Sequence, residues 1–209
     1  SVSNINVNND AGTCGASIAI AQPTTADNCG VASVMGERSD NQLLTADYPV
    51  GTTTITWTVR DVNGNSVSTT QAIVVTDNEK PTISVSNINV NNDAGKCGAS
   101  ITIAQPITAD NCGVASVMGE RSDNQLLTAD YPVGTTTITW TVRDVNGNSV
   151  STTQTIVVTD NEKPTISATN LNVSNDAGKC GASITIAAPN TSDNCGVANV
   201  DGVRSDNAS

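Results

Sequence analysis

The clearest pattern in the chain is an alternation of apolar and polar side chains around each tryptophan. In residues 135–143, Ile138, Trp140 and Val142 alternate with threonine. This is the pattern of a strand that buries one face. The Asn-Gly pair in residues 144–148 follows at once, and that pair is a strong signal for a hairpin turn. The pattern predicts a β-hairpin whose tryptophan lies in the core.

Other short runs indicate further strands on either side of this hairpin. They are residues 99–104, with Ile101 and Ile103 on one face, residues 114–118, the return strand 149–159, and the opening strand 164–173 of the next copy. About seven short strands, with turn signals every 8–12 residues, are typical of an immunoglobulin-like sandwich. The sequence therefore predicts an all-β protein.

The chain repeats itself with a period of 83 residues. Cys14, Cys97 and Cys180 obey this shift, as do Trp57 and Trp140. Residues 1–83 and 84–166 differ at four positions: Thr13/Lys96, Ala19/Thr102, Thr24/Ile107 and Ala72/Thr155. A unit of this length is enough for one small β-domain and too long for one turn of a solenoid.

We therefore predict tandem immunoglobulin-like β-sandwich domains, arranged as beads on a string. The boundaries are 1–77, with an incomplete opening strand, 78–160, and 161–209, the first half of a third domain. Half a sandwich exposes its core face, so either the chain continues or another chain completes this half. The first is favoured, because the first copy has no spare half to donate.

Charge and composition exclude several functions. The 209 residues carry a net charge of −11, with nine scattered Lys and Arg and no His. Nucleic acid needs a basic face, and no apolar run is long enough for membrane insertion. Without His, the Ser-His-Asp and Cys-His catalytic arrangements are impossible, so we expect no enzyme. Clustered carboxylates favour calcium as a cofactor.

Six cysteines, two in each copy, indicate disulfides in an oxidising compartment. A zinc site is disfavoured, because there is no His and no C-x-x-C. The expectation is one bond within each copy: Cys14–Cys29, Cys97–Cys112 and Cys180–Cys195. A straight strand between the two cysteines would keep them apart, so a bond between neighbouring copies is the alternative. It would leave one cysteine unpaired at each end.

Acidic and amide residues recur in three segments: the linker between copies, the loop before the second cysteine, and the hairpin after the tryptophan strand. In a seven-strand sandwich all three fall at the end where the chain enters. We therefore expect calcium near this junction, with candidate ligands Asp77, Glu79, Asp110, Asp144, Asn146, Asp160, Glu162 and Asp193. The alternative is that the same residues only form turns, or that Arg60 and Arg143 bind the aspartates.

Three motifs in fixed order resemble the hyalin repeat (HYR) module. They are "CGASITIAQPITADNCG", "YPVGTTTITWTVRDVNGNS" and "IVVTDNEKP". The resemblance implies an immunoglobulin-like fold and an extracellular adhesive or spacer role, and this variant looks like those of bacterial surface proteins. The Asp-Asn-Glu run before proline also resembles cadherin-type linkers, in which calcium ties successive domains.

We therefore expect an extracellular structural or adhesive module that forms a rod or filament stalk on a cell surface, with acidic DNEKP junctions. Its partners would be neighbouring repeats, and other copies in a fibre or a cell-surface ligand. The alternative is a calcium-dependent module that binds carbohydrate or protein. Few aromatic residues are present to form a sugar platform, and Trp140 looks like core, so Tyr131 would have to be exposed.

Overall fold

A computed structural model describes residues 2–205 of the chain. Within this range the regular structure is entirely β, which confirms the predicted fold class. None of the described residues belongs to a helix of the length and apolarity that crossing a membrane requires.

The described residues form sixteen strands, which are distributed over the three sequence copies. The first copy holds β1 (Ile5–Asn8), β2 (Gly15–Ala16), β3 (Val31–Arg38), β4 (Tyr48–Pro49), β5 (Gly51–Asp61) and β6 (Ser66–Thr76). The second holds β7 (Thr82–Ser84), β8 (Ile88–Asn91), β9 (Gly98–Ala99), β10 (Ile107–Ala109), β11 (Val114–Arg121), β12 (Tyr131–Pro132), β13 (Gly134–Asp144) and β14 (Ser149–Thr159). The third holds β15 (Thr165–Ser167) and β16 (Asn190–Ser192).

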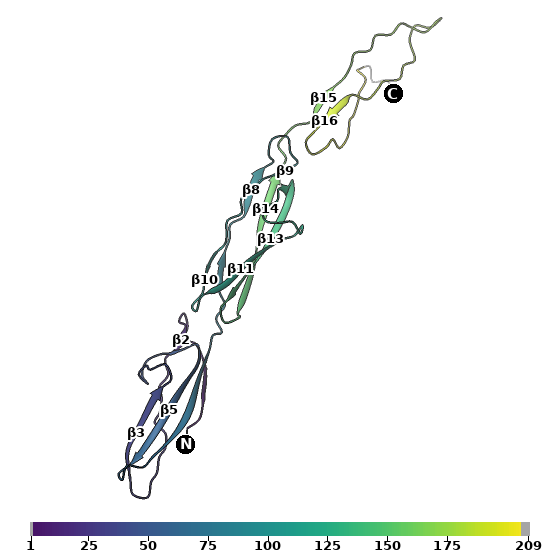
Figure 1. Ribbon diagram of the computed structural model, residues 1–209. Coiled ribbons are helices and arrows are strands. Elements are labelled where there is room, and N and C mark those ends of the chain that lie inside the picture. Colours follow the sequence, from purple (N-terminus) through teal and green to yellow (C-terminus); the bar gives the residue numbers. More distant parts are fainter. Residues whose placement is uncertain (1, 206–209) are drawn as a thin grey trace. The chain divides into compact units, whose positions relative to one another are not determined.

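The main sheet of the first copy has the strand order β1-β6-β5-β3. Figure 1 labels β5 and its neighbour β3 in this sheet. The β5–β6 hairpin is the one predicted from the alternating pattern, and its Asn-Gly turn places Gly64 at φ 94°. β3 runs antiparallel to β5, whereas β1 adds to the other edge in parallel with β6. The short pair β2–β4 forms a second layer.

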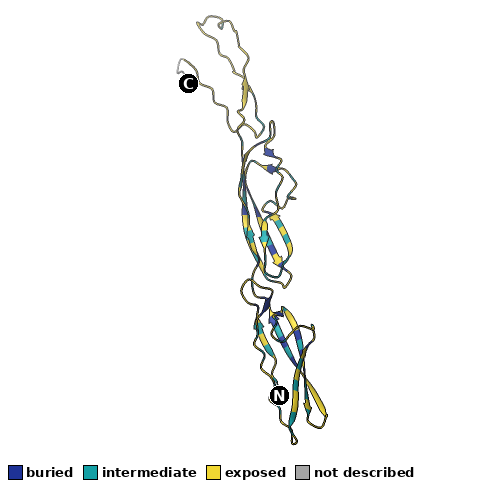
Figure 2. Ribbon diagram, turned by 90° about the vertical axis from the view of Figure 1, so that its left-hand side faces the viewer, coloured by how far each residue is buried: buried dark blue, intermediate teal, exposed yellow. Residues whose placement is uncertain are grey.

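The core lies between these layers and contains both aromatic residues of the copy. Trp57 and Tyr48 are 1% and 0% exposed, and Ile55, Ile73 and Val75 pack with them. Figure 2 shows the alternation of buried and exposed positions along the strands. The buried indole donates to Gln71 Oε1 at 2.9 Å, so its polar N–H is satisfied.

A buried arginine, which the sequence pattern did not reveal, holds the long loop between β3 and β4. The Arg38 side chain is fully buried, bonds both oxygens of Asp40, and donates to three backbone carbonyls of the loop. Its guanidinium also stacks 3.8 Å from the centre of the Tyr48 ring. This hydrogen bonding lowers the pKa of the Asp40 carboxyl. Arg121 repeats the arrangement with Asp123 and Tyr131.

The main sheet of the second copy has the strand order β8-β14-β13-β11, which matches β1-β6-β5-β3 of the first copy strand by strand. The short pairs β7–β10 and β9–β12 are separate two-stranded sheets. The predicted return strand 149–159 is confirmed as β14, and the predicted strand 114–118 extends to Arg121. The predicted strand over residues 99–104 is wrong. Only Gly98 and Ala99 pair, with Tyr131 and Pro132, and no strand covers residues 100–104.

Up to residue 205, the third copy contributes only the pair β15–β16. The predicted opening strand 164–173 is reduced to Thr165–Ser167. Several large apolar side chains of this copy are exposed, as expected for half a sandwich: Leu171, Val173, Ile184 and Ile186.

The chain forms two compact units that cut across the second copy. The first combines Ser1–Val85 with Gln105–Gly119 and Trp140–Thr152. The second combines Ser86–Ala104 with Glu120–Thr139 and Thr153–Ser209. The loop of the second copy that carries Cys112 thus belongs to the same unit as the whole first copy. The domain boundaries after Asp77 and Asp160 stay a prediction.

Replacing Trp57 with alanine tests the predicted core. Because the indole fills the centre of the core and its N–H is hydrogen-bonded, Trp57→Ala is expected to lower the free energy of unfolding by about 3–5 kcal/mol. The control Val67→Ala removes a side chain that is 69% exposed and should change it by less than about 0.5 kcal/mol. Urea denaturation followed by circular dichroism measures both, and equal effects would contradict the assigned core.

Candidate functional site

The disulfides join neighbouring copies instead of closing loops within one copy. Cys14 bonds Cys112 and Cys97 bonds Cys195, each across 98 residues of sequence. Cys29 and Cys180 are exposed free thiols. The expected pairs Cys14–Cys29, Cys97–Cys112 and Cys180–Cys195 are therefore wrong, and the alternative, a bond between copies with one free cysteine at each end, describes the chain.

The first copy shows why its two cysteines do not meet. The carbonyl of Cys14 accepts a hydrogen bond from Val50, just before β5, whereas the carbonyl of Gly30, next to Cys29, accepts one from Val62, just after β5. An 11-residue strand separates these two points, which is roughly 35 Å at the usual rise per residue. A disulfide requires Cα atoms less than about 7 Å apart.

Each inter-repeat disulfide has an asparagine beside it that strengthens the same contact. The Asn111 amide donates to the carbonyl of Thr13 at 3.0 Å and to Asp77 Oδ1 at 3.3 Å. Asn194 makes the equivalent bonds, to the carbonyl of Lys96 at 2.8 Å and to Asp160 Oδ1 at 3.3 Å. The asparagine that precedes the second cysteine of a copy therefore connects the preceding copy to the linker aspartate through hydrogen bonds.

Three aspartates from three segments meet next to the first of these disulfides. Asp77 of the linker, Asp110 of the loop before Cys112, and Asp144 at the end of β13 each bring a carboxylate oxygen within 4.8 Å of the other two. Asp77 and Asp144 are only 5% and 1% exposed. We call these three residues the junction carboxylate cluster; the sequence placed all three at this end of the sandwich.

Hydrogen bonds fix two members of the cluster. Asp144 accepts bonds from the backbone amides of Asn146, Gly147 and Asn148 and from the Asn148 side chain. Burial acts to raise its pKa, but these bonds outweigh burial and lower it. Asp77 accepts from the backbone of Glu79 and from the Asn111 and Asn146 side chains.

Asp110, the third member, is different. Both of its carboxylate oxygens are buried and neither accepts a hydrogen bond. Burial raises the pKa of Asp110, and the negative charges of Asp144 and Asp77 raise it further. The backbone amide of Cys112 is near enough to lower this pKa in part, although it does not form a hydrogen bond with the carboxylate. The counterparts Asp27 and Asp193 each accept a bond from the amide two residues on.

Glu79 and Glu162, two of the predicted calcium ligands, accept hydrogen bonds from the preceding copy. Glu79 Oε1 accepts from the Asn9 side chain at 2.9 Å and from the Gly12 amide at 2.8 Å, so it caps a turn of the preceding copy. Glu162 repeats this with Asn92 and Gly95. Glu79 is therefore not among the carboxylates that meet at the junction carboxylate cluster. Asn146 lies at the cluster, where its amide nitrogen donates to Asp77 Oδ2 at 2.8 Å.

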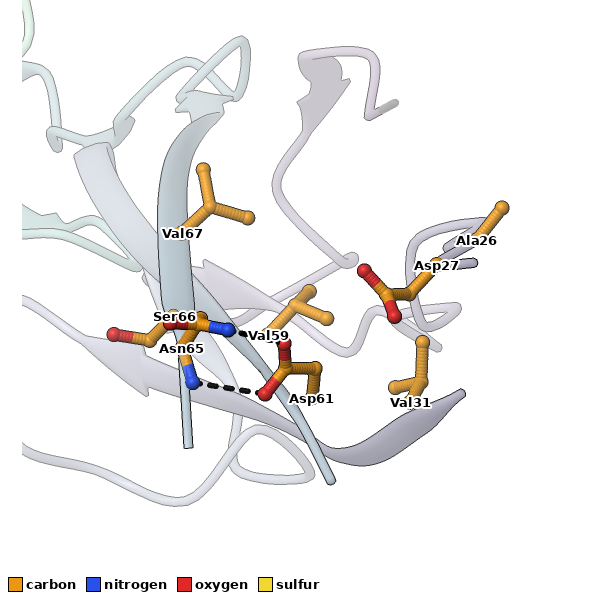
Figure 3. A pocket seen from close by; sticks show the side chains of 8 residues that line it. All are labelled: Ala26, Asp27, Val31, Val59, Asp61, Asn65, Ser66 and Val67. Carbon is orange, nitrogen blue, oxygen red and sulfur yellow. Dashed lines mark hydrogen bonds between the residues drawn. The ribbon is translucent and has the colours of Figure 1, made fainter. Parts of the chain in front are cut away.

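The two other copies each hold only part of the cluster. In the first copy, Asp27 and Asp61 line a pocket of about 220 Å³, with Asp61 held by Asn65 (Figure 3), and no linker aspartate precedes them in the sequence. In the third, Asp160 and Asp193 are present, but the 209 residues contain no counterpart of Asp144. The full set of three occurs once, at Asp77, Asp110 and Asp144.

The raised pKa of Asp110 predicts a pH-dependent effect of Asp110→Asn in metal-free buffer. A group with a raised pKa in the folded state contributes stability below its unfolded pKa, near 3.8, and loses it as the pH rises through the folded value. The asparagine variant should therefore be the more stable protein at neutral pH, and the difference should vanish below about pH 4. Melting curves at several pH values measure this, and a wild type that is more stable at neutral pH would contradict it.

Comparison with known proteins agrees with the motifs. Residues 76–158 match the HYR domain family model. Hyalin of the sea urchin Strongylocentrotus purpuratus is 31% identical over 202 residues, covering 91% of this chain and 16% of hyalin. Hyalin of Lytechinus variegatus is 32% identical over 197 residues, covering 90% of this chain and 36% of hyalin. The chain thus spans a minor part of these relatives, and their animal origin does not support the likeness to bacterial surface proteins.

Similar solved structures have cadherin and fibronectin-like folds. Drosophila N-cadherin EC1-4 aligns with a TM-score of 0.36 at 14% identity, over 74% of this chain and 47% of that one. The fibronectin(III)-like modules of Clostridium thermocellum CbhA align with a TM-score of 0.29 at 14% identity, over 76% and 91%. The family model covers the second copy, and the first copy is nearly identical to it in sequence. Residues 76–158 therefore match the HYR domain family, and 90–91% of the chain is similar to hyalin.

Proposed function

We propose that this chain is a structural segment of an extracellular adhesive array, a stalk or filament whose repeats bear tension in series. The observation that carries the proposal is the overlap of the two disulfides. Cys97 lies between Cys14 and Cys112 in the sequence, so the loop closed by one bond overlaps the loop closed by the other.

This overlap limits how far the chain can stretch. Without the bonds, Cys14 and Cys195 are 181 residues apart (195 − 14), or about 630 Å when fully extended. With them, the shortest covalent path runs from Cys14 to Cys112, back to Cys97, and across to Cys195. Its only peptide segment is the 15 residues between 97 and 112 (112 − 97), about 55 Å of chain. Even an unfolded repeat would then lengthen the array very little.

The chemistry of the chain supports an extracellular setting. Disulfides persist in oxidising compartments, and hyalin-like repeats are adhesion-type modules. The DNEKP linkers support a stiff junction, because Glu79 and Glu162 bond back to the preceding copy, and the prolines that follow restrict the backbone.

A sugar-binding role receives no support from the aromatic residues. All four of them, Tyr48, Trp57, Tyr131 and Trp140, are at most 1% exposed, and Arg38 and Arg121 cover the two tyrosine rings. Sugar sites usually present an aromatic face, and none is on the surface. The structural role is therefore favoured over the carbohydrate-binding alternative.

Single-molecule stretching between the two chain ends tests the proposal. The oxidised chain should reach only about 65 Å between Cys14 and Cys195 after complete unfolding, and reductant should release roughly 570 Å more. The double variant Cys97→Ser/Cys195→Ser is the matched control. It keeps one bond and should extend between the same points by about 290 Å, since 83 residues then separate Cys112 from position 195.

A non-reduced chain that extends to its full length at once would contradict the proposal that the repeats bear tension in series. So would a double variant that stretches no further than the parent, because the second bond would then not lie in the force path.

A further inference from the structure

The junction carboxylate cluster lacks a positive partner. Asp77, Asp110 and Asp144 bring three formal negative charges within 4.8 Å of one another. Among residues 2–205, no Lys or Arg forms an ion pair with any of them; the ion pairs present involve other aspartates. Asp77 and Asp144 are buried and Asp110 is partly buried. Like charges this close repel one another, so the geometry favours a cation or a proton between them.

Asp110 points to a bound cation as the missing partner. Its oxygens are buried and accept no hydrogen bond, although the counterparts Asp27 and Asp193 accept one from a nearby backbone amide. An unpaired buried carboxylate costs free energy unless it is bound by a positive group. It lies where Asp77 and Asp144 present their own carboxylates, and those two are held in place by amide donors.

We propose that Asp77, Asp110 and Asp144 bind one calcium ion at the junction between the first and second copies. The site offers only oxygen ligands, from three separate segments, and neither His nor a free Cys takes part in it. Calcium accepts six to eight oxygens in flexible geometry, so the three carboxylates leave room for waters and amide oxygens. Magnesium requires a near-ideal octahedron and keeps most of its own water.

The ion would fix three segments at one point. Asp77 belongs to the linker, Asp110 to the loop that carries Cys112, and Asp144 to the β13–β14 hairpin, and Asn111 already connects the linker aspartate to the turn at Thr13. The inference rests on this local geometry and not on the proposed role in bearing tension, so either can fail alone. It also predicts one site per 209-residue chain, because the complete set of three aspartates occurs once.

Isothermal titration of the full oxidised chain with calcium chloride, after removal of metal by a chelator, tests the proposal at pH 7.5. We expect one ion per chain and a higher melting temperature with calcium, because a ligand that binds only the folded state stabilises it. Asp110→Asn should weaken binding at least tenfold and abolish the melting shift. This variant loses no hydrogen bond, so it should fold, which circular dichroism in chelator checks.

The matched control is Asp27→Asn, the same substitution in the first copy, where no linker aspartate is present. It should leave the stoichiometry, the affinity and the melting shift unchanged. Absence of calcium binding to the parent chain would overturn the proposal and indicate that a shared proton neutralises the cluster. Equal loss of binding in both variants, or magnesium binding as tight as calcium binding, would overturn it as well.

Discussion

The bond between the first cysteine of one repeat and the second cysteine of the next is the constraint on which this structure depends. Cys14–Cys112 places a loop of the second copy against the turn of the first, and the loop becomes part of the same compact unit. The asparagine before Cys112, the linker aspartate and the aspartate of the β13–β14 hairpin all gather around that contact. A repeat of this kind is therefore not an independent bead, because its entry end is completed by its predecessor.

The contact between the first and second copies around Cys14–Cys112 combines interactions of different strength and reversibility. The disulfide is covalent and limits extension even when the repeats unfold. The hydrogen bonds of Asn111 and Glu79 orient the linker but are lost on unfolding. A cation at the junction carboxylate cluster would add a third interaction, which depends on the concentration of the free ion. Reduction would remove the disulfide and a chelator would remove the cation, so the two treatments would weaken this contact independently.

Local sequence patterns predicted the local structure well. Alternation around the tryptophans, the Asn-Gly turn and the 83-residue period were sufficient to predict the β5–β6 hairpin, its buried Trp57 and the corresponding hairpin of the second copy. Strand direction alone placed Asp77, Asp110 and Asp144 at one end. These features depend on neighbours in sequence or on a simple topological rule.

The failures concern contacts that no local pattern encodes. The disulfide partners depend on which cysteine lies at which end of β5, and the equal spacing within every copy fits either pairing. Glu79 is a candidate calcium ligand by its place in an acidic linker, whereas its Oε1 accepts hydrogen bonds from the Asn9 side chain and the Gly12 amide of the preceding copy. Arg38 gave no signal, because a buried arginine cannot be distinguished by sequence from an exposed one.

Peptide mapping of the non-reduced chain tests the covalent connection most directly. Trypsin cuts after Arg38, Lys96, Arg121, Lys179 and Arg204, so the cysteines fall into three peptides, residues 1–38, 97–121 and 180–204, with two in each. After free thiols are blocked and the chain is unfolded, the bonds Cys14–Cys112 and Cys97–Cys195 predict a single product in which all three peptides are joined, with blocking groups on Cys29 and Cys180. Three separate peptides, each with an internal disulfide and no blocking group, would contradict it.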